Sequence, residues 1–157
     1  MVEAVEDGLD ANGNLFIAGG TTLVVGPSSG DNGILDYDGT FSCTGGILLG
    51  VGSFGMGAPS PSNTSNYLTR GLSTSGSNIV AITDESGKVL SALKYEKSTQ
   101  VLLYFNGNTT ASTCKVYLNP TLDETQLNTL GYASDITISG GTEITTAAST
   151  SGMPSRW

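Results

Sequence analysis

Histidine is absent from the sequence, which removes the common forms of nucleophilic and metal-dependent catalysis. Among 157 residues, six are Lys or Arg and 14 are Asp or Glu, so the formal net charge is −8. Without histidine there is no Ser-His-Asp or Cys-His nucleophile, and the commonest transition-metal ligand is missing. Because phosphate binding needs clustered Lys and Arg, we expect neither nucleic acid nor a membrane surface as a partner. Calcium or a neutral polysaccharide is compatible with this composition.

Long apolar runs are also missing, and cysteine is scarce. No segment is long and apolar enough to span a membrane, and no basic segment followed by an apolar stretch marks a signal peptide. The two cysteines, Cys43 and Cys114, are too few for a disulfide framework. Cys43 takes an apolar position of the repeat described below, so we expect a small buried residue. A bridge between Cys43 and Cys114 stays open at this point.

Glycine is abundant, and the apolar residues are regularly spaced. The sequence has 22 glycines, and only 13% of its residues are charged. This profile is typical of an all-β protein with many turns, and the charge is too low for a typical disordered segment.

Residues 9–26 and 35–52 carry the same pattern, displaced by 26 residues. The matching pairs are Leu9 and Leu35, Asp10 and Asp36, Asn12 and Asp38, Gly13 and Gly39, Gly19-Gly20 and Gly45-Gly46, Leu23 and Leu49, and Val25 and Val51. A period of this length is typical of solenoids. In the first unit, alternation places Leu15 and Ile17 on an inward face, and a Gly-Gly corner leads to a second inward face at Leu23 and Val25. The pattern predicts a short right-handed parallel β-helix in which each residue lies over its partner 26 positions on.

Residues 1–6 do not fill a coil and supply no cap, although solenoid ends usually need one. Two interpretations follow. The chain is a fragment of a longer protein with further coils upstream, or this N-terminal coil edge pairs with another chain, since exposed strand edges readily do so. The second interpretation predicts self-association.

A segment with a different residue pattern follows the repeat. Residues 53–62 read as a Gly/Pro/Ser loop. Strands are expected at residues 78–83, 88–95, 100–105 and 113–119, with a fifth at 67–72. Residues 84–87 and 106–108 have the composition of hairpin turns. The sequence therefore predicts an inserted antiparallel sheet or half-sandwich over residues 66–119.

The repeat signature returns near the C-terminus. Residues 123–130 have the composition of a short helical turn, and residues 136–144 repeat the strand and Gly-Gly pattern. The prediction is a single module spanning residues 1–157, with coils at 1–52 and 132–146 and a tail at 147–157.

Acidic turns are the candidate metal site, within a group formed by Glu6, Asp7, Asp10 and Asn12 in one unit and Asp31, Asp36 and Asp38 in the next. Asp10, Asn12, Asp36 and Asp38 form two stacked D-x-[DN]-G turns, about 4.8 Å apart if the coils stack, and such oxygen ligands suit Ca²⁺. Asp and Asn also stabilise tight turns through hydrogen bonds to the backbone, so a purely structural role stays open. A carboxylate pair could serve a glycosidase, but such enzymes generally need a longer groove and basic residues for uronates.

Four aromatic residues are candidates for stacking on a sugar ring. Tyr37 lies in the acidic turn, Phe16 is out of phase with its inward neighbours, and Tyr104 and Tyr117 lie on predicted strands. Ordinary packing between the coils and the inserted sheet is the alternative for each of them.

These motifs carry a family resemblance over most of the chain. The quoted motifs are residues 7–13, residues 35–41 with Gly45-Gly46, Gly55-Met56 with its Pro/Ser loop, residues 84–89 and residues 138–141. Together they resemble the bacterial carbohydrate-binding domain-containing proteins. The resemblance implies a non-catalytic, polysaccharide-binding module of a secreted or cell-surface protein, with an extracellular location. The alternatives are a structural or adhesive surface module and, less favoured, a polysaccharide lyase or glycoside hydrolase.

Overall fold

The computed structural model describes residues 1–63 and 65–148, and this part of the chain is all-β. Its strands are β1 Val2–Glu3, β2 Leu9–Ala11, β3 Leu15–Ile17, β4 Thr21–Val25, β5 Leu35–Tyr37, β6 Phe41–Cys43, β7 Ile47–Gly52, β8 Tyr67–Gly71, β9 Ser77–Thr83, β10 Val89–Glu96, β11 Val101–Asn106, β12 Lys115–Leu118, β13 Tyr132–Ala133 and β14 Thr142–Glu143. Two 3₁₀ turns are η1 Ala111–Thr113 and η2 Glu124–Gln126. Neither of these helical turns could cross a lipid bilayer, and the described residues contain no other helix.

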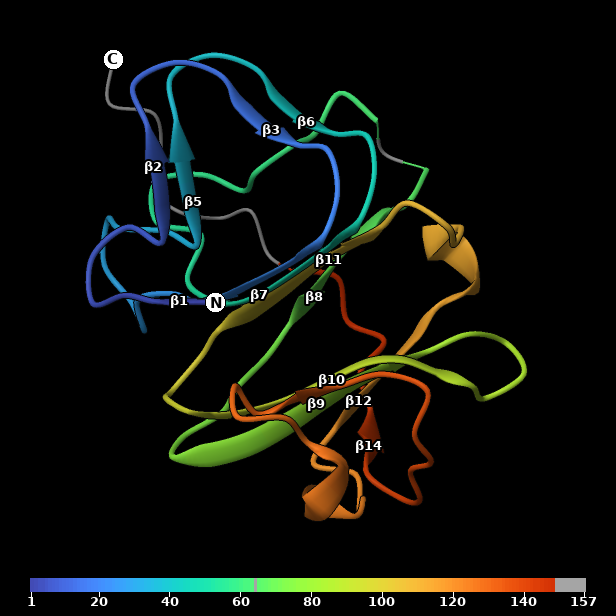
Figure 1. Ribbon diagram of the computed structural model, residues 1–157. Coiled ribbons are helices and arrows are strands. Elements are labelled where there is room, and N and C mark those ends of the chain that lie inside the picture. Colours follow the sequence, from blue (N-terminus) through green and yellow to red (C-terminus); the bar gives the residue numbers. More distant parts are fainter. Residues whose placement is uncertain (64, 149–157) are drawn as a thin grey trace.

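The strands form two five-stranded sheets and two parallel pairs (Figure 1). Sheet I has the order β1-β4-β7-β11-β8, and sheet II has the order β13-β10-β9-β12-β14. The parallel pairs β2-β5 and β3-β6 cover one face of sheet I, while sheet II packs against the other face (Figure 1). Sheet I is therefore buried on both faces.

The 26-residue repeat is confirmed as a stacking register. We call residues 7–26 the first repeat and residues 33–52 the second repeat. The strand pairs β2-β5, β3-β6 and β4-β7 are parallel, and each pairs residues 26 positions apart. Leu9 lies beside Leu35, and Leu15 beside Phe41, as the sequence predicted. Glycines at equal positions, such as Gly20 and Gly46, allow this close stacking.

The faces of β4 and β7 differ from the prediction. Leu23 and Val25 do not face the interior of the repeat; they point into the core between the two sheets, together with Leu49 and Val51. Val24 and Leu48 face the repeat interior instead. Strands buried on both faces read as continuous apolar runs, so their alternation does not reveal which face belongs to which core.

The region predicted as a separate inserted sheet, residues 66–119, is divided between the two sheets. β11 pairs antiparallel with β7 and with β8, so β8 and β11 complete sheet I. β9, β10 and β12 form the centre of sheet II. The hairpin turn at 84–87 is confirmed, but residues 106–108 lead out of sheet I toward η1 and sheet II. Turn composition alone does not show which strand comes next, which explains this error.

The predicted third coil at residues 132–146 does not form. β13 pairs antiparallel with β10, and β14 pairs antiparallel with β12. Between them Ile136 and Ile138 pack on the outer face of sheet II, beside the buried Ala81, Val89 and Ala92. Thr121 and Ser139 form an antiparallel bridge, which holds this segment on sheet II rather than on the repeats. Of the predicted tail at 147–157, residues 149–157, with Trp157, lie outside the described residues.

Cys43 and Cys114 are both buried and free. Cys43 belongs to the core of the repeats and Cys114 to the core between the sheets, so sheet I separates them. The prediction of a small buried residue at position 43 is confirmed. Burial raises the pKa of the Cys43 thiol from 9.0 to about 12.

This shifted pKa predicts a loss of stability in alkali. The unfolded chain releases the Cys43 proton near its ordinary pKa of 9.0, whereas the folded protein holds it to about 12. The contribution of the Cys43 thiol to the free energy of unfolding is complete below pH 9.0 and is lost as the pH rises from 9.0 to about 12. In this range the folded state binds more protons than the unfolded state, so a rising pH favours unfolding. Urea denaturation from pH 8 to 11 should show a shallower decline for Cys43→Ala than for the wild type. Equal declines would contradict the prediction.

Candidate functional site

The loop after β7 folds back over the second repeat. We call residues 53–63 the covering loop. Phe54 forms an antiparallel bridge with Gly33, and the backbone N–H of Ser62 donates to the carbonyl oxygen of Phe41 at 2.9 Å. The Tyr67 hydroxyl donates to the carbonyl oxygen of Pro59 at 3.0 Å. These contacts fix the covering loop against the side of the second repeat that faces away from the first.

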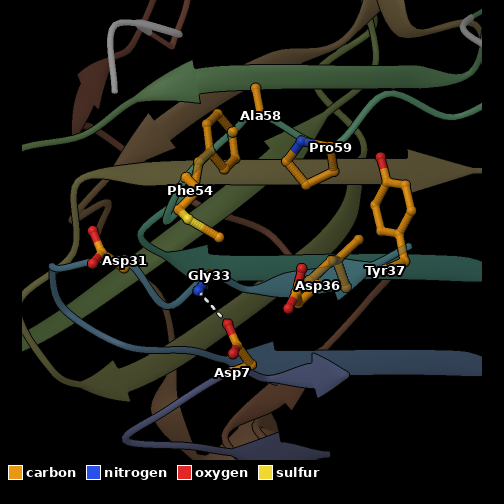
Figure 2. A pocket seen from close by; sticks show the side chains of 11 residues that line it. Asp7, Asp31, Gly33, Asp36, Tyr37, Phe54, Ala58 and Pro59 are labelled. Atoms are coloured by element: carbon orange, nitrogen blue, oxygen red, sulfur yellow. Dashed lines mark hydrogen bonds between the residues drawn. The ribbon is translucent and has the colours of Figure 1, made fainter. Parts of the chain in front are cut away.

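A pocket of about 220 Å³ lies between β5 and the covering loop (Figure 2). Side chains from both repeats, from the segment that joins them and from the covering loop line it. The lining residues are Asp7, Asp31, Gly33, Leu35, Asp36, Tyr37, Phe54, Met56, Gly57, Ala58 and Pro59. The pocket thus depends on the stacking of the two repeats.

One side of the pocket is acidic. Asp7, Asp31 and Asp36 line it, and no Lys or Arg among the described residues does. One carboxylate oxygen of Asp7, Oδ1, accepts a hydrogen bond of 2.7 Å from the backbone N–H of Gly33, so this side chain is held in place (Figure 2). Asp31 and Asp36 are exposed, and their carboxylates accept no hydrogen bond among the described residues. These carboxylates can accept hydrogen bonds from the hydroxyl groups of a ligand.

The opposite side is apolar. Phe54, Ala58 and Pro59 lie on this side, with Tyr37 beside Pro59 (Figure 2). Met56, which also lines the pocket, is 78% exposed. The Tyr37 hydroxyl accepts a hydrogen bond from the backbone N–H of Ser60 at 3.0 Å, and this bond joins β5 to the covering loop.

Tyr37 and Tyr67 anchor this wall through Phe41. The Tyr37 ring lies 5.5 Å from the Phe41 ring, and the Tyr67 ring packs edge-on against Phe41 at 6.3 Å. Burial, and to a smaller extent the neighbouring Tyr37 and Cys43, raises the pKa of Tyr67, which keeps its hydroxyl a donor to the covering loop. Aromatic packing of this kind preorganises the pocket wall.

The structure separates the four aromatic residues predicted to bind sugar. Tyr37 lines the pocket. Phe16 is 63% exposed on β3, as expected from its phase, but it lies outside the pocket. Tyr104 is only 1% exposed, and its hydroxyl accepts a hydrogen bond from Asn106, so its ring packs between the sheets and cannot stack on a ligand. Tyr117 is half-buried on sheet II, away from the pocket.

The predicted metal ligands are not gathered at one point. Asp36 lines the pocket, whereas Asp10, its partner in the register, and the exposed Asn12 and Asp38 do not. Within residues 1–63 and 65–148, no three His, Cys, Asp or Glu side chains come together in a way that could hold a metal ion. The described residues therefore show no preformed calcium site, and calcium binding stays a prediction.

Several pocket residues were not identified from the sequence as binding residues. Asp7 and Asp31 are acidic like the chosen candidates but belong to no D-x-[DN]-G turn. Phe54, Met56 and Pro59 belong to the covering loop, whose return to the second repeat has no local sequence signal.

Comparison of the chain with protein-family models, curated proteins and solved structures finds no match.

Proposed function

We propose that the protein is a non-catalytic carbohydrate-binding module, with the pocket between β5 and the covering loop as its sugar site. The observation that carries the proposal is the joining of an acidic side and an apolar, aromatic side in one pocket. A sugar ring offers hydroxyl groups at its edge and an apolar face, and this pocket supplies a partner for each. Sites that bind small ligands generally combine apolar walls with a few placed polar groups in this way.

The acidic side also bears on the class of polysaccharide. Asp7, Asp31 and Asp36 repel carboxylate groups, and no Lys or Arg in the part of the chain that the structure describes lines the pocket to offset them. Neutral plant polysaccharides therefore fit the pocket better than uronic acid polymers do when no cation is bound.

The proposal also covers the finer fold of the module and its location. The three parallel pairings 26 residues apart support a short right-handed parallel β-helix as the finer description of the repeats. The family resemblance supports a bacterial protein that is secreted or held at the cell surface. Catalysis is not part of the proposal, since within residues 1–63 and 65–148 no basic residue accompanies the carboxylates of the pocket.

Affinity electrophoresis in gels containing neutral plant polysaccharides tests the proposal. The wild type should be retarded by at least one polymer, and Asp36→Asn should weaken that binding about tenfold, equivalent to 1.4 kcal/mol, by removing a hydrogen bond to the ligand. Tyr37→Ala should have at least this effect. Each gel is run with Ca²⁺ and with EDTA, which tests the calcium prediction separately.

Two matched variants control the experiment. Asp10→Asn removes a carboxylate that is paired in register with Asp36 but lies outside the pocket, and Tyr117→Ala removes a tyrosine from sheet II. Both should bind like the wild type. Retardation by no polymer, or equal binding by the pocket variants and their controls, would overturn the proposal.

A further inference from the structure

The two repeats have equivalent residues, but those of the first repeat are left partly uncovered. Leu35 is 4% exposed and Phe41 is 1% exposed. Their partners in the register, Leu9 and Leu15, are only half-buried. β2 and β3 each pair on one side only, with β5 and β6, within the described residues. The first repeat therefore ends in an apolar surface bordered by two free strand edges.

Side-chain hydrogen bonds between the repeats show the same difference. The backbone N–H of Gly33 donates to Oδ1 of Asp7 at 2.7 Å, and that of Thr40 donates to Oδ1 of Asn14 at 2.8 Å. Asp7 and Asn14 occupy the positions of Gly33 and Thr40 one period earlier. Their own backbone N–H groups have no acceptor among the described residues. Two backbone donors that are satisfied in the second repeat thus find no acceptor in the first among residues 1–63 and 65–148.

Glycine positions give an independent indication of what covers this end. A Cβ atom at Gly39 would lie 2.9 Å from the carbonyl oxygen of Gly13, and one at Gly45 would lie 2.7 Å from that of Ala18, so both positions require glycine. At the equivalent Gly13 and Gly19, no atom of the described residues lies within 4 Å of such a Cβ, and neither glycine has a positive φ. Nothing in the described structure requires glycine at these two positions, whereas the close approach of another backbone would.

We propose that the exposed end of the first repeat, beside β2 and β3, is a docking surface for two further β-strands that carry the pattern of residues 7–20, since β1 already pairs with β4. This partner runs parallel to β2 and β3 and covers Leu9 and Leu15. Asp or Asn side chains at the positions of Asp7 and Asn14 accept hydrogen bonds from the two free backbone N–H groups. The docking surface is distinct from the sugar pocket.

A second copy of this protein does not supply such strands. The opposite side of the second repeat is occupied by the covering loop, through the Gly33–Phe54 bridge and the Ser62 to Phe41 hydrogen bond, so copies cannot stack head to tail. Two copies could also meet through the same end, related by a two-fold axis. Such an axis makes the paired edge strands either antiparallel, or parallel with their inward faces on opposite sides, so it cannot continue the stacking of the repeats. Self-association through this edge, one interpretation of the sequence, is therefore an alternative outcome of the test.

The test is a variant in which residues 1–6 are replaced by a second copy of residues 7–32. Hydrogen exchange followed by NMR should show at least about tenfold slower exchange at the amides of the original Asp7 and Asn14, because each gains an acceptor. A matched variant, in which the Asp and Asn of the added copy are both alanine, should lose this protection. Gly13→Ala in the original repeat should also abolish it, while leaving the stability of the unextended protein unchanged.

Three results would overturn the proposal. The first is fast exchange at both amides in an extended protein that is otherwise folded. The second is protection of both amides in the unextended protein on dimerisation at high concentration, which would identify a second copy as the partner. The third applies if the extended variant fails to fold. A peptide of residues 7–20, which leaves the pairing of β1 with β4 intact, is then added to the unextended protein and leaves the amide signals of Asp7 and Asn14 unchanged. Because the readout is amide exchange, failure here is distinguishable from failure of sugar binding.

Discussion

Replacing Gly46 by alanine is expected to lower the free energy of unfolding by about 2–5 kcal/mol, from left-handed backbone strain and overpacking together. Gly46 has φ of +75°, and its Cβ would overlap the carbonyl oxygen of Gly20 and the backbone of Gly19. The overlapped atoms belong to the stacked first repeat, where the N–H of Ile47 donates to the Gly20 carbonyl at 2.8 Å. The backbone must therefore shift to admit a methyl group.

Gly20→Ala is the matched control for this prediction. Gly20 holds the same position of the repeat and has φ of +70°, but no atom of the residues that the structure describes lies within 4 Å of its Cβ position. Its replacement should cost only the left-handed strain, roughly 1–2 kcal/mol. Urea denaturation followed by circular dichroism measures both variants. Equal losses would show that the stacking of the repeats does not restrict Gly46, and would contradict the prediction.

The stacking register could be predicted from the sequence because many residues specify it independently. Each parallel pairing joins residues 26 positions apart, and a shift by one residue would turn every apolar side chain to the wrong face. Glycines at equal positions, such as Gly20 and Gly46, further restrict the alignment. Redundant local signals of this kind identify a register even without an alignment of related sequences.

The long-range arrangement could not be predicted in the same way. The sequence of β11 identifies a strand, but not that its partners are β7 and β8. Residues 136–144 repeat the strand and Gly-Gly pattern of the first repeat, yet they pack on sheet II because Ile136 and Ile138 find apolar neighbours there. Strand patterns specify burial, while the choice between two buried surfaces depends on packing of the whole chain.

The candidate site was predictable only where it coincides with the repeat. Tyr37 and Asp36 were identified because the acidic turn recurs, and both line the pocket. Tyr104 was misjudged, since a tyrosine on an alternating strand can face either side and its hydroxyl finds a partner in the core. Phe54 enters the pocket through the covering loop, whose position follows from tertiary contacts.

Phe41→Ala is expected to lower the free energy of unfolding by about 3–5 kcal/mol, the usual cost of emptying a buried aromatic site. Phe41 is 1% exposed in the core of the repeats, and its ring contacts those of Tyr37 and Tyr67. The total stability of a natural domain is about 5–15 kcal/mol, so this variant should be close to unfolding at 37 °C. Thermal denaturation followed by circular dichroism measures the loss.

Phe16→Ala separates the effect of burial from the loss of an aromatic residue. Phe16 lies on β3, the strand that stacks on β6, but it is 63% exposed, so its removal should change the free energy of unfolding by no more than about 0.5 kcal/mol. The two variants should also differ in sugar binding. Because Tyr37 rests on Phe41, the folded fraction of Phe41→Ala should bind more weakly, whereas Phe16→Ala should bind like the wild type. Equal stability of the two variants would show that Phe41 is not part of a packed core, and normal binding by folded Phe41→Ala would show that it does not hold Tyr37 in the pocket.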